Sequence, residues 1–327
     1  MPAGRIPFCL PWITKDDSEA VADALMSQWL TDGPKLSQFE EALAEYLDIK
    51  HVVAVSNCTA ALHLAMCSLD ISVGDEVILP VFTFAATANA VLYRGAKPVL
   101  ADIDPSTLNV SPDEIKNKLS KRTKAIIVVH YAGQPCDMRT IMEIANDRSL
   151  PVVEDCAHSL GATCMGKKTG TIGTAGCFSF YPTKNITTLE GGMITSNDDH
   201  VARKARLLRS HAMTRTASER ERESSWFYDI VDLGYNYRLN EPQAALGMSQ
   251  LRRLEDANRM RISAAREYNQ SLAACPGIVT PSVTQGHVFH LYVIRVLKER
   301  YGLSRDELFR RLSREGIGLS VHYTPLH

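Results

Sequence analysis

Hydrophobic residues in the first half of the chain gather in short runs, separated by segments with helical spacing. The runs are rich in valine and isoleucine, which is typical of strands buried on both faces of a sheet. They predict strands at HVVAVS, EVILP, KPVLADID, KAIIVVH and PVVEDCA. The segments between them predict helices at about residues 59–69, 85–93, 111–119 and 138–148. This alternation predicts an α/β domain around a largely parallel sheet.

The N-terminal segment predicts two further helices, joined by the turn WLTDGPK. Thr14 can cap the first helix, whose apolar residues recur at helical spacing. The second helix is predicted to begin at Ser37, because Glu40 follows three residues later as in a capping box. We assign residues 1–30 as a helical arm of the large domain.

The second half of the chain predicts a smaller unit. Residues 213–225 are polar without an apolar period and predict an exposed, mobile loop. A long helix over about residues 242–272 is predicted to follow and to link two domains. The last stretch predicts a strand in VFHLYVIRV, a helix capped by Ser304 and a strand in LSVHY. We therefore expect a large domain over residues 1–245 and a small α+β domain over residues 246–327.

The composition narrows the class of protein. The 327 residues are 45% hydrophobic and 22% charged, as is usual for globular proteins in water. A net charge of -1 provides no basic face for a nucleic-acid backbone, and no apolar run is long enough to span a membrane. The N-terminus lacks the apolar core of a signal peptide, and the eight cysteines form no CxxC pair. We expect a cytoplasmic protein without a metal centre, a nucleic-acid partner or a membrane anchor.

Ligands of parallel α/β sheets bind outside the carboxyl ends of the strands, so the residues after each strand are site candidates. Residues 56–60 lead from the first strand into a helix, where free amides and the Thr59 hydroxyl suit a phosphate. Alternatively, Thr59 is only the N-cap of that helix. Phe82 and Phe84 follow the second strand and can stack on a ligand ring or belong to the core.

Two later strand ends carry titratable groups. Glu154, Asp155 and His158 follow an apolar strand, where a buried carboxylate needs a partner, and they can also form a structural ion pair or a cap. Ser179 and Lys184 follow the apolar segment CFSFYP. A lysine in a dry site becomes a nucleophile towards carbonyls, whereas an exposed Lys184 would be ordinary. A phosphate cradle, a stacking aromatic ring, an acid and a lysine are together what pyridoxal phosphate (PLP) requires.

The sequence resembles the DegT/StrS-type sugar aminotransferases, PLP enzymes of the aspartate aminotransferase fold type (fold type I). The similarity runs in order through WLTDGPKLSQFE, SNCTAALHLA, PVFTFAATANAVLYRGAKPVLADID, VHYAGQPCDM, VVEDCAHSLGA, FSFYPTKNITTLEGGMI, DLGYNYRLNEPQAALG and VHYTPLH. It covers nearly the whole chain. The resemblance implies a large domain with a mostly parallel central sheet flanked by helices, and a smaller α+β C-terminal domain.

The resemblance also implies a role for each site residue. Lys184 would form the Schiff base with the cofactor and then carry protons between cofactor and substrate. Asp155 would pair with the pyridine nitrogen, His158 would lie near the ring hydroxyl, and Phe84 would stack on the ring. The other cofactor contacts would come from Cys58, Thr59, Ala60 and Ser179, with Asn236 completing the phosphate site of a neighbouring subunit.

The implied reaction is transamination in a homodimer with shared active sites. Glutamate would give its amino group to the cofactor, which would pass it to a keto group on a nucleotide-linked deoxy sugar. Two half-reactions at one site imply ping-pong kinetics. The substrate candidates are Thr31, Tyr181, Arg238 and His322, with Arg238 and His322 also candidates for the donor carboxylate. The sequence leaves open which sugar is aminated, at C3 or C4, and on which face.

Three departures from the family pattern qualify this interpretation. Leu189 in TTLEGG and Ala212 in RSHAMTR stand where glycine is usual, and a residue with a Cβ is expected to avoid a positive φ there. Related chains continue for several tens of residues past the PLH motif, so the small domain is expected to lack its last elements.

Two alternative functions stay open. A sugar dehydratase of the same family is one alternative, but it would carry histidine in place of Lys184. A catalytically inactive PLP-binding regulator is the other.

Overall fold

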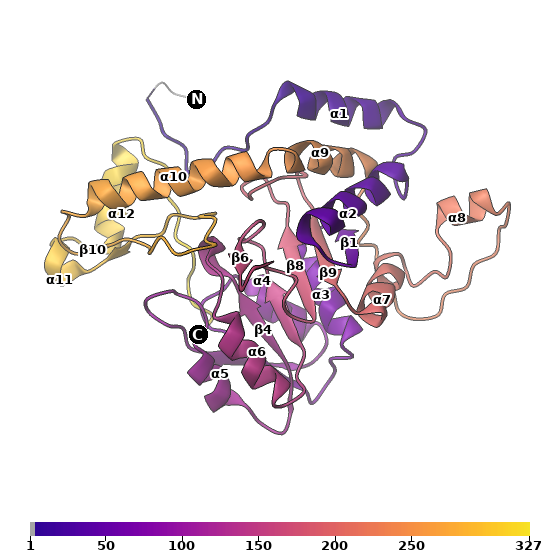
Figure 1. Ribbon diagram of the computed structural model, residues 1–327, viewed down its shortest axis with the longest axis horizontal. Helices are drawn as coiled ribbons and strands as arrows, with labels where there is room; N and C mark the ends of the chain where they lie inside the picture. The colour runs from indigo at the N-terminus through magenta and orange to yellow at the C-terminus, as the bar shows by residue number, and fades with distance from the viewer. Residues whose placement is uncertain (1–3) are drawn as a thin grey trace.

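The computed structural model describes residues 4–327 and is built around one seven-stranded sheet (Figure 1). The strand order is β1-β9-β8-β5-β4-β2-β3. The strands are β1 (His51–Val55), β9 (Gly192–Ser196), β8 (Ala175–Ser179), β5 (Val152–Asp155), β4 (Thr123–Val129), β2 (Glu76–Pro80) and β3 (Lys97–Ala101). The pairs from β8 to β3 are parallel, and only β9 runs against its neighbours. The predicted α/β fold with a mostly parallel sheet is therefore confirmed.

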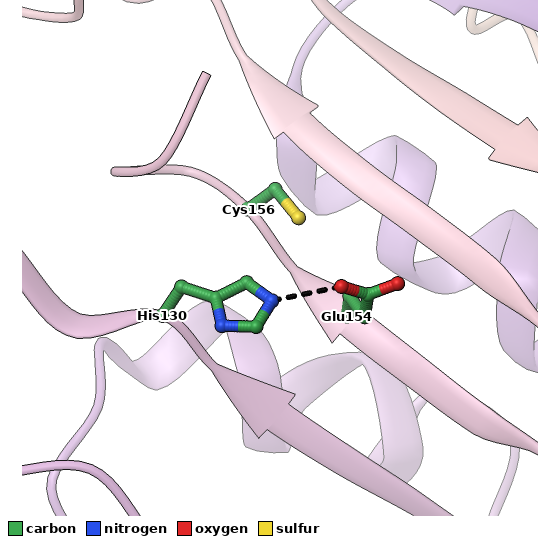
Figure 2. Close-up of side chains that lie close together, drawn as sticks. All are labelled: His130, Glu154 and Cys156. Carbon is green, nitrogen blue, oxygen red and sulfur yellow. Dashed lines mark hydrogen bonds and ion pairs between the residues drawn. The ribbon is translucent and has the colours of Figure 1, made fainter. Parts of the chain in front are cut away.

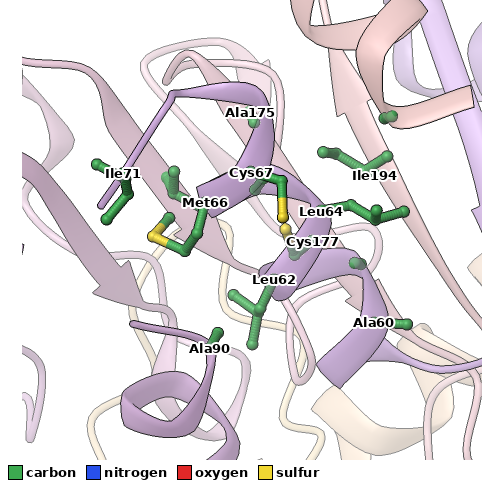
Figure 3. Close-up of a cluster of buried hydrophobic side chains, with 14 of the residues drawn as sticks. Ala60, Leu62, Leu64, Met66, Cys67, Ile71, Ala90, Ala175, Cys177 and Ile194 are labelled. Atoms are coloured by element: carbon green, nitrogen blue, oxygen red, sulfur yellow. The ribbon is translucent and has the colours of Figure 1, made fainter. Parts of the chain in front are cut away.

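Helices cover both faces of this sheet because successive strand residues point to opposite sides. Val53, Val77, Ile127 and Cys177 belong to a core with helices α3 (Cys58–Ser68), α4 (Ala85–Leu92) and α7 (Asp199–Arg209). Their chain neighbours Val52, Ile78, Ile126 and Phe178 face α2 (Pro34–Leu47), α5 (Pro112–Lys118) and α6 (Met138–Asn146). Figure 3 shows Leu64 and Cys67 of α3 beside Cys177 of β8 and Ile194 of β9, with Met66 on the other side of the helix next to Ile71. The strands that α3 covers are therefore packed between helices on both faces of the sheet.

The remaining elements lie outside the two layers. Helix α1 (Lys15–Met26) lies against α9 (Glu241–Leu251), which is followed by α10 (Leu254–Leu272) along one side of the molecule (Figure 1). Helices α11 (Lys298–Tyr301) and α12 (Arg305–Arg314) lie at the far end of α10, and α8 (Ala217–Arg222) lies at the opposite end of the molecule. Two small sheets and a 3-10 turn complete the structure: β6 (Thr163–Cys164) with β7 (Lys167–Lys168), β10 (Ile278–Val279) with β11 (Arg295–Val296), and Tyr131–Gly133.

Several element boundaries differ from those predicted. Helix α2 begins at Pro34 because Glu241, on α9, accepts hydrogen bonds from the amides of Gly33, Lys35 and Leu36. This long-range cap replaces the local capping box expected at Ser37. The long helix predicted over residues 242–272 is two helices, broken between α9 and α10.

Three other predictions were wrong in the C-terminal half or beside the first strand. The segment predicted as a loop contains the short helix α8, capped by Thr216. The strands predicted in VFHLYVIRV and LSVHY shrink to β11 and to irregular chain. Asn57, and not Thr59, caps α3, because its side-chain oxygen accepts the Ala60 amide at 2.8 Å. The cap of α3 and the cap of α8 are both local, since Asn57 and Thr216 each accept the amide three residues later.

Both residues that replace the usual glycines adopt a left-handed backbone. Leu189 has φ 69° and Ala212 has φ 54°, so the expectation that they avoid positive φ was wrong. A side chain with a Cβ costs about 1–2 kcal/mol in this conformation. The Leu189 side chain is 59% exposed and gains little burial in return. The surrounding turn holds this backbone, since the Leu189 amide donates to Thr187 at 3.0 Å.

Replacing Leu189 with glycine is expected to stabilise the protein. Relief of the left-handed strain, about 1–2 kcal/mol, exceeds the backbone entropy that glycine costs, roughly 0.5–1 kcal/mol. The urea midpoint should therefore rise. Glu190→Gly is the matched control, because Glu190 is exposed next door without a positive φ, and it should lower the midpoint. A lower midpoint for Leu189→Gly would contradict the strain argument.

The structure shows the state of the cysteines and the character of the helices. All eight cysteines are free, and Cys58, Cys67, Cys136, Cys156 and Cys177 are buried. Burial raises the pKa of each of these five thiols, so they pack as small neutral hydrophobes. Among the described residues, no helix combines the length and the apolar character that crossing a bilayer requires.

Candidate active site

Two adjacent carboxylates at the end of β5 point to opposite sides of the sheet. Glu154 has the parity of Val152 and faces the layer of α2, α5 and α6. Asp155 has the parity of Val153 and faces α3 and α4. Strand geometry alone therefore gives the two acids different environments. The residue pattern alone left both as candidates, whereas the resemblance assigned only Asp155 to the pyridine nitrogen.

Glu154 is a buried carboxylate whose oxygens are held by a closed set of hydrogen bonds (Figure 2). One of its oxygens lies 2.9 Å from Nε2 of His130, and its carboxylate also accepts the amides of Gly170, Ile172 and Gly173. His130 accepts the Cys136 amide at Nδ1 (3.0 Å), so its Nε2 carries the proton that Glu154 receives. Although His130, Glu154 and Cys156 lie close enough for a metal, both imidazole nitrogens already have partners. Glu154 thus anchors the 170–173 loop.

Asp155 is a buried carboxylate aimed at the other side. The Thr87 hydroxyl donates to Oδ2 at 2.9 Å, and the Ala157 amide donates to Oδ1 at 3.1 Å. Because Thr87 donates to Asp155, Thr83 must donate to Thr87 across their 2.8 Å contact. Burial raises the pKa of Asp155, against the opposing effects of these donors and of Lys184. Among the described residues no cation forms an ion pair with it, so Asp155 is available to a positively charged ligand group.

Lys184 lies in the turn after β8, at the same edge of the sheet. Its amide donates to the Tyr181 carbonyl at 2.9 Å, and the turn is tied back where Phe180 pairs with Thr188 and Gly191. Burial lowers the pKa of the Lys184 amine, while Cys58 and Asp155 oppose the shift. No hydrogen bond or ion pair within the described chain engages its Nζ. The alternative of an ordinary exposed lysine does not fit this environment.

His158 is neutral and has a defined tautomer. Burial and the nearby Lys184 hold the pKa of His158 well below its usual range. Its Nδ1 accepts the Ala132 amide at 3.2 Å, so Nε2 carries the proton and donates to the Tyr323 hydroxyl at 2.8 Å. The His290 ring lies 4.6 Å from the His158 ring, centroid to centroid. His158 therefore presents a fixed, uncharged face to the site.

The N-terminus of α3 offers donors beside these groups. Asn57 occupies the Ala60 amide, which leaves the amides of Cys58 and Thr59 as the unengaged donors of this first turn. Ser179 lies at the end of β8, two strands from β1 in the sheet, and its hydroxyl accepts the Tyr181 amide at 3.4 Å. Free amides at a helix N-terminus bind phosphate groups.

The aromatic residues predicted from the second strand separate into two roles. Phe84 is the N-cap residue of α4 and is 60% exposed, whereas Phe82 is partly buried against Tyr131. The Tyr323 ring lies 5.8 Å from the Phe84 ring and 6.0 Å from that of His158. Phe84 is thus free to cover a planar ligand, and Phe82 is part of the core.

The candidate substrate residues are more scattered. Thr31 is exposed and pairs with Asn240 beside the start of α9, and Arg238 lies 3.9 Å from Asp32 in the same region. Tyr181 is 47% exposed in the lysine turn. The His322 ring stacks on Phe8 of the N-terminal arm, and its carbonyl accepts the Tyr131 hydroxyl.

Asn236 lies in an exposed segment on the outside of α3. Its backbone pairs with Ser210, and the next residue, Tyr237, accepts the Ser56 amide at 2.8 Å. Within the described chain its side chain forms no hydrogen bond with any of the cofactor residues. This position fits a residue that faces outward from its own subunit.

The sequence analysis did not identify three residues that the structure places at the site. Thr87 positions Asp155, Tyr323 contacts His158, and Arg261 lies on α10 near Lys184. Only Tyr323 had a local signal, since it adjoins His322 in VHYTPLH. Thr87 and Arg261 look like ordinary helix residues, and only the fold brings them to the site.

The residues at this edge fit PLP. A buried carboxylate without a cationic partner suits the pyridine nitrogen, and an unpartnered lysine of lowered pKa suits the aldehyde carbon. The unengaged amides at the start of α3 suit the phosphate. The sheet topology and this donor set define a PLP-dependent aminotransferase of fold type I.

Comparisons with known proteins give the family. Spore coat polysaccharide biosynthesis protein SpsC of Bacillus subtilis is 43% identical over 326 residues, which are 98% of this chain and 84% of SpsC. Two solved structures match at 32% identity with a TM-score of 0.91: PseC of Helicobacter pylori, an aminotransferase involved in the biosynthesis of pseudoaminic acid, and the PMP-form of a putative sugar aminotransferase, Spr1654, of Streptococcus pneumoniae. Both matches cover 98% of this chain, and 85% and 86% of the other.

The DegT/DnrJ/EryC1/StrS aminotransferase family model matches residues 11–327, and the chain belongs to this family. It is a PLP-dependent sugar aminotransferase, as the resemblance of its motifs implied.

Proposed function

We propose that the protein transfers the amino group of glutamate to the keto group of a nucleotide-linked deoxy sugar. The observation that carries this proposal is the half-buried Lys184, which has no partner among the described residues, at the same sheet edge as Asp155. The printed roles of SpsC in spore coat polysaccharide and of PseC in pseudoaminic acid biosynthesis support a sugar acceptor.

Each site residue has a proposed task in this reaction. Bound PLP supplies an electron sink that weakens bonds at the carbon bearing the amine. Asp155 holds a proton on the pyridine nitrogen, and Thr87 and Ala157 fix its orientation. Lys184 holds the cofactor through Nζ, then removes and returns the proton of the substrate carbon. Cys58 and Thr59 bind the phosphate with their amides, with Ala60 and Ser179 beside them, and Phe84 covers the ring.

We further propose a homodimer in which Asn236 completes the phosphate site of the second subunit. An exposed apolar segment next to Asn236 supports this: Trp226 is 85%, Ile230 62% and Leu233 76% exposed. Contiguous exposed apolar residues mark interaction surfaces. Light scattering should give twice the chain mass of 36.2 kDa. Thr31, Tyr181, Arg238 and His322 remain the proposed substrate contacts.

The test is to incubate the purified protein and PLP with glutamate and a panel of nucleotide-linked keto sugars. We expect stoichiometric 2-oxoglutarate and a sugar product with the mass of the amine. Glutamate alone should convert the cofactor's absorption band in a single turnover. A spectrum unmoved by any amino donor would instead favour a PLP-binding regulator, and loss of water from the sugar without amination would favour a dehydratase.

A further inference from the structure

A small cavity lies between the N-terminal arm and α10, next to the lysine. Its volume is about 40 Å³. Residues from the arm, the lysine turn, α9 and α10 line it: Leu10, Pro11, Trp12, Pro182, Lys184, Asn185, Thr187, Gln250, Arg253, Ala257 and Arg261. This volume exceeds the roughly 10–15 Å³ that one water needs, but it is too small for a sugar ring. A compact polar group, such as a carboxylate, fits it.

The two arginines of this lining differ in their partners. Arg253 forms an ion pair with Asp17 and donates to the Trp12 carbonyl. Arg261 has neither a hydrogen bond nor an ion pair among the residues that the structure describes. Burial lowers the pKa of Arg261, yet a guanidinium remains charged at neutral pH. Besides Lys184, the cavity lining therefore contains a second cation, Arg261, whose charge no described residue balances.

The groups around Arg261 do not provide the missing anion. Burial raises the pKa of the Cys9 thiol, so that this neighbour stays neutral. Burial, together with the charges of Lys184 and Arg261, holds the pKa of His290 well below its usual range. The Nδ1 atom of His290 is also buried without a hydrogen-bond partner. Lys184 and Arg261 thus lack a hydrogen-bond or ion-pair partner among the described residues, and so does Nδ1 of the nearby His290.

We infer that Arg261 binds the α-carboxylate of the amino-acid donor, an inference that rests on the proposed function. The amine of the donor must reach the position of the Lys184 amine, because both amines would bind the same carbon of the cofactor. The α-carboxylate is attached to the carbon that bears this amine, so it must lie next to Lys184. The cavity that Lys184 and Arg261 both line is at that place. A bidentate arginine–carboxylate pair would hold the donor in a fixed orientation.

This assignment differs from the candidates taken from sequence. Arg238 already has Asp32 at 3.9 Å, and His322 stacks on Phe8. We therefore assign Arg238 and His322 to parts of the substrates other than the donor α-carboxylate. Arg261 is a specificity-determining residue for the donor, and it acts in the first half-reaction only.

The test compares Arg261→Gln with Arg266→Gln, a change of an exposed arginine on the same helix. Loss of a charge-assisted hydrogen bond should raise the KM for glutamate about 10–100-fold in Arg261→Gln, with kcat and the KM for the sugar changed little. Other α-amino acids should lose affinity equally, whereas 4-aminobutyrate, which lacks an α-carboxylate, should react as with the unmodified protein. Calorimetry with glutarate, which needs no turnover, should show a similar loss of affinity. Arg266→Gln should leave all values unchanged.

Each outcome decides between named alternatives. An unchanged glutamate KM in Arg261→Gln would overturn the role of Arg261 and leave the proposed function standing. A raised sugar KM with an unchanged donor KM would assign the cavity to a phosphate of the nucleotide sugar and overturn it as well. An unmodified protein that never reacts with glutamate would refute the proposed function itself. If Arg261→Gln does not fold, Arg261→Lys replaces it, and an unaltered donor KM there and unaltered glutarate binding would count against the inference.

Discussion

Lys184→Ala is expected to abolish transamination, with turnover lowered by about 10⁴-fold or more, because both its covalent and its acid–base roles are lost. Borohydride treatment of the PLP-loaded protein should fix the cofactor to Lys184 in the unmodified chain. Mass spectrometry of the proteolytic peptides should find no such adduct in the variant. An adduct that persists at another lysine would refute the assignment.

The structure provides sharp controls for this experiment. Lys184→Arg keeps the positive charge but lacks a nucleophilic amine, so it should be as inactive as the alanine variant. Lys167→Ala removes an exposed lysine from β7 and should retain full activity. The fold should survive all three changes, since no described hydrogen bond involves the Lys184 amine. Circular dichroism checks this point.

Asp155→Asn is expected to leave the fold and cofactor binding largely intact but to lower kcat by about 10²–10³-fold, the usual cost of removing one electrostatic contact to the reacting system. The asparagine oxygen can still accept the Ala157 amide, and its NH2 group can donate to the Thr87 hydroxyl, which can rotate to accept. It carries no charge to hold the pyridine nitrogen protonated. Asp155→Ala should lose turnover further. Near-normal kcat with either variant would refute the role.

The adjacent acid is the matched control, since it differs only in which side of the sheet it faces. Glu154→Gln should lower the free energy of unfolding, because it disturbs the buried hydrogen bond with His130 and three backbone hydrogen bonds. The turnover of the remaining folded protein should be close to normal. If Glu154→Gln instead lowers turnover without lowering stability, our assignment of the structural role to Glu154 and the cofactor role to Asp155 would be wrong.

The sequence predicted the large domain well because its signals are local. Apolar, β-branched runs that are mostly buried between two layers leave few alternatives to a parallel sheet, and all five predicted strands are present. The start of α2 was predicted wrongly because a distant partner decides it. Glu241 caps α2 from more than 200 positions away, as the amide of Gly33 shows. Leu189 and Ala212 keep a glycine-like backbone because the turns around them hold it, against the preference of the side chain.

For the site, the sequence by itself determined which residue types stand at the strand ends, and the resemblance assigned their roles. The residue pattern alone could not assign different roles to Glu154 and Asp155. Two adjacent acidic residues do not reveal which groups pack against each face of the sheet. The tertiary structure decided this: the strand's period of two places Glu154 among backbone amides and His130, and Asp155 beside Thr87 and the lysine. It alone brought Arg261 to the same cavity as Lys184, because helix α10 is positioned by packing and not by its own sequence. Chemistry at a strand end is local information, whereas burial and partnership depend on the whole chain.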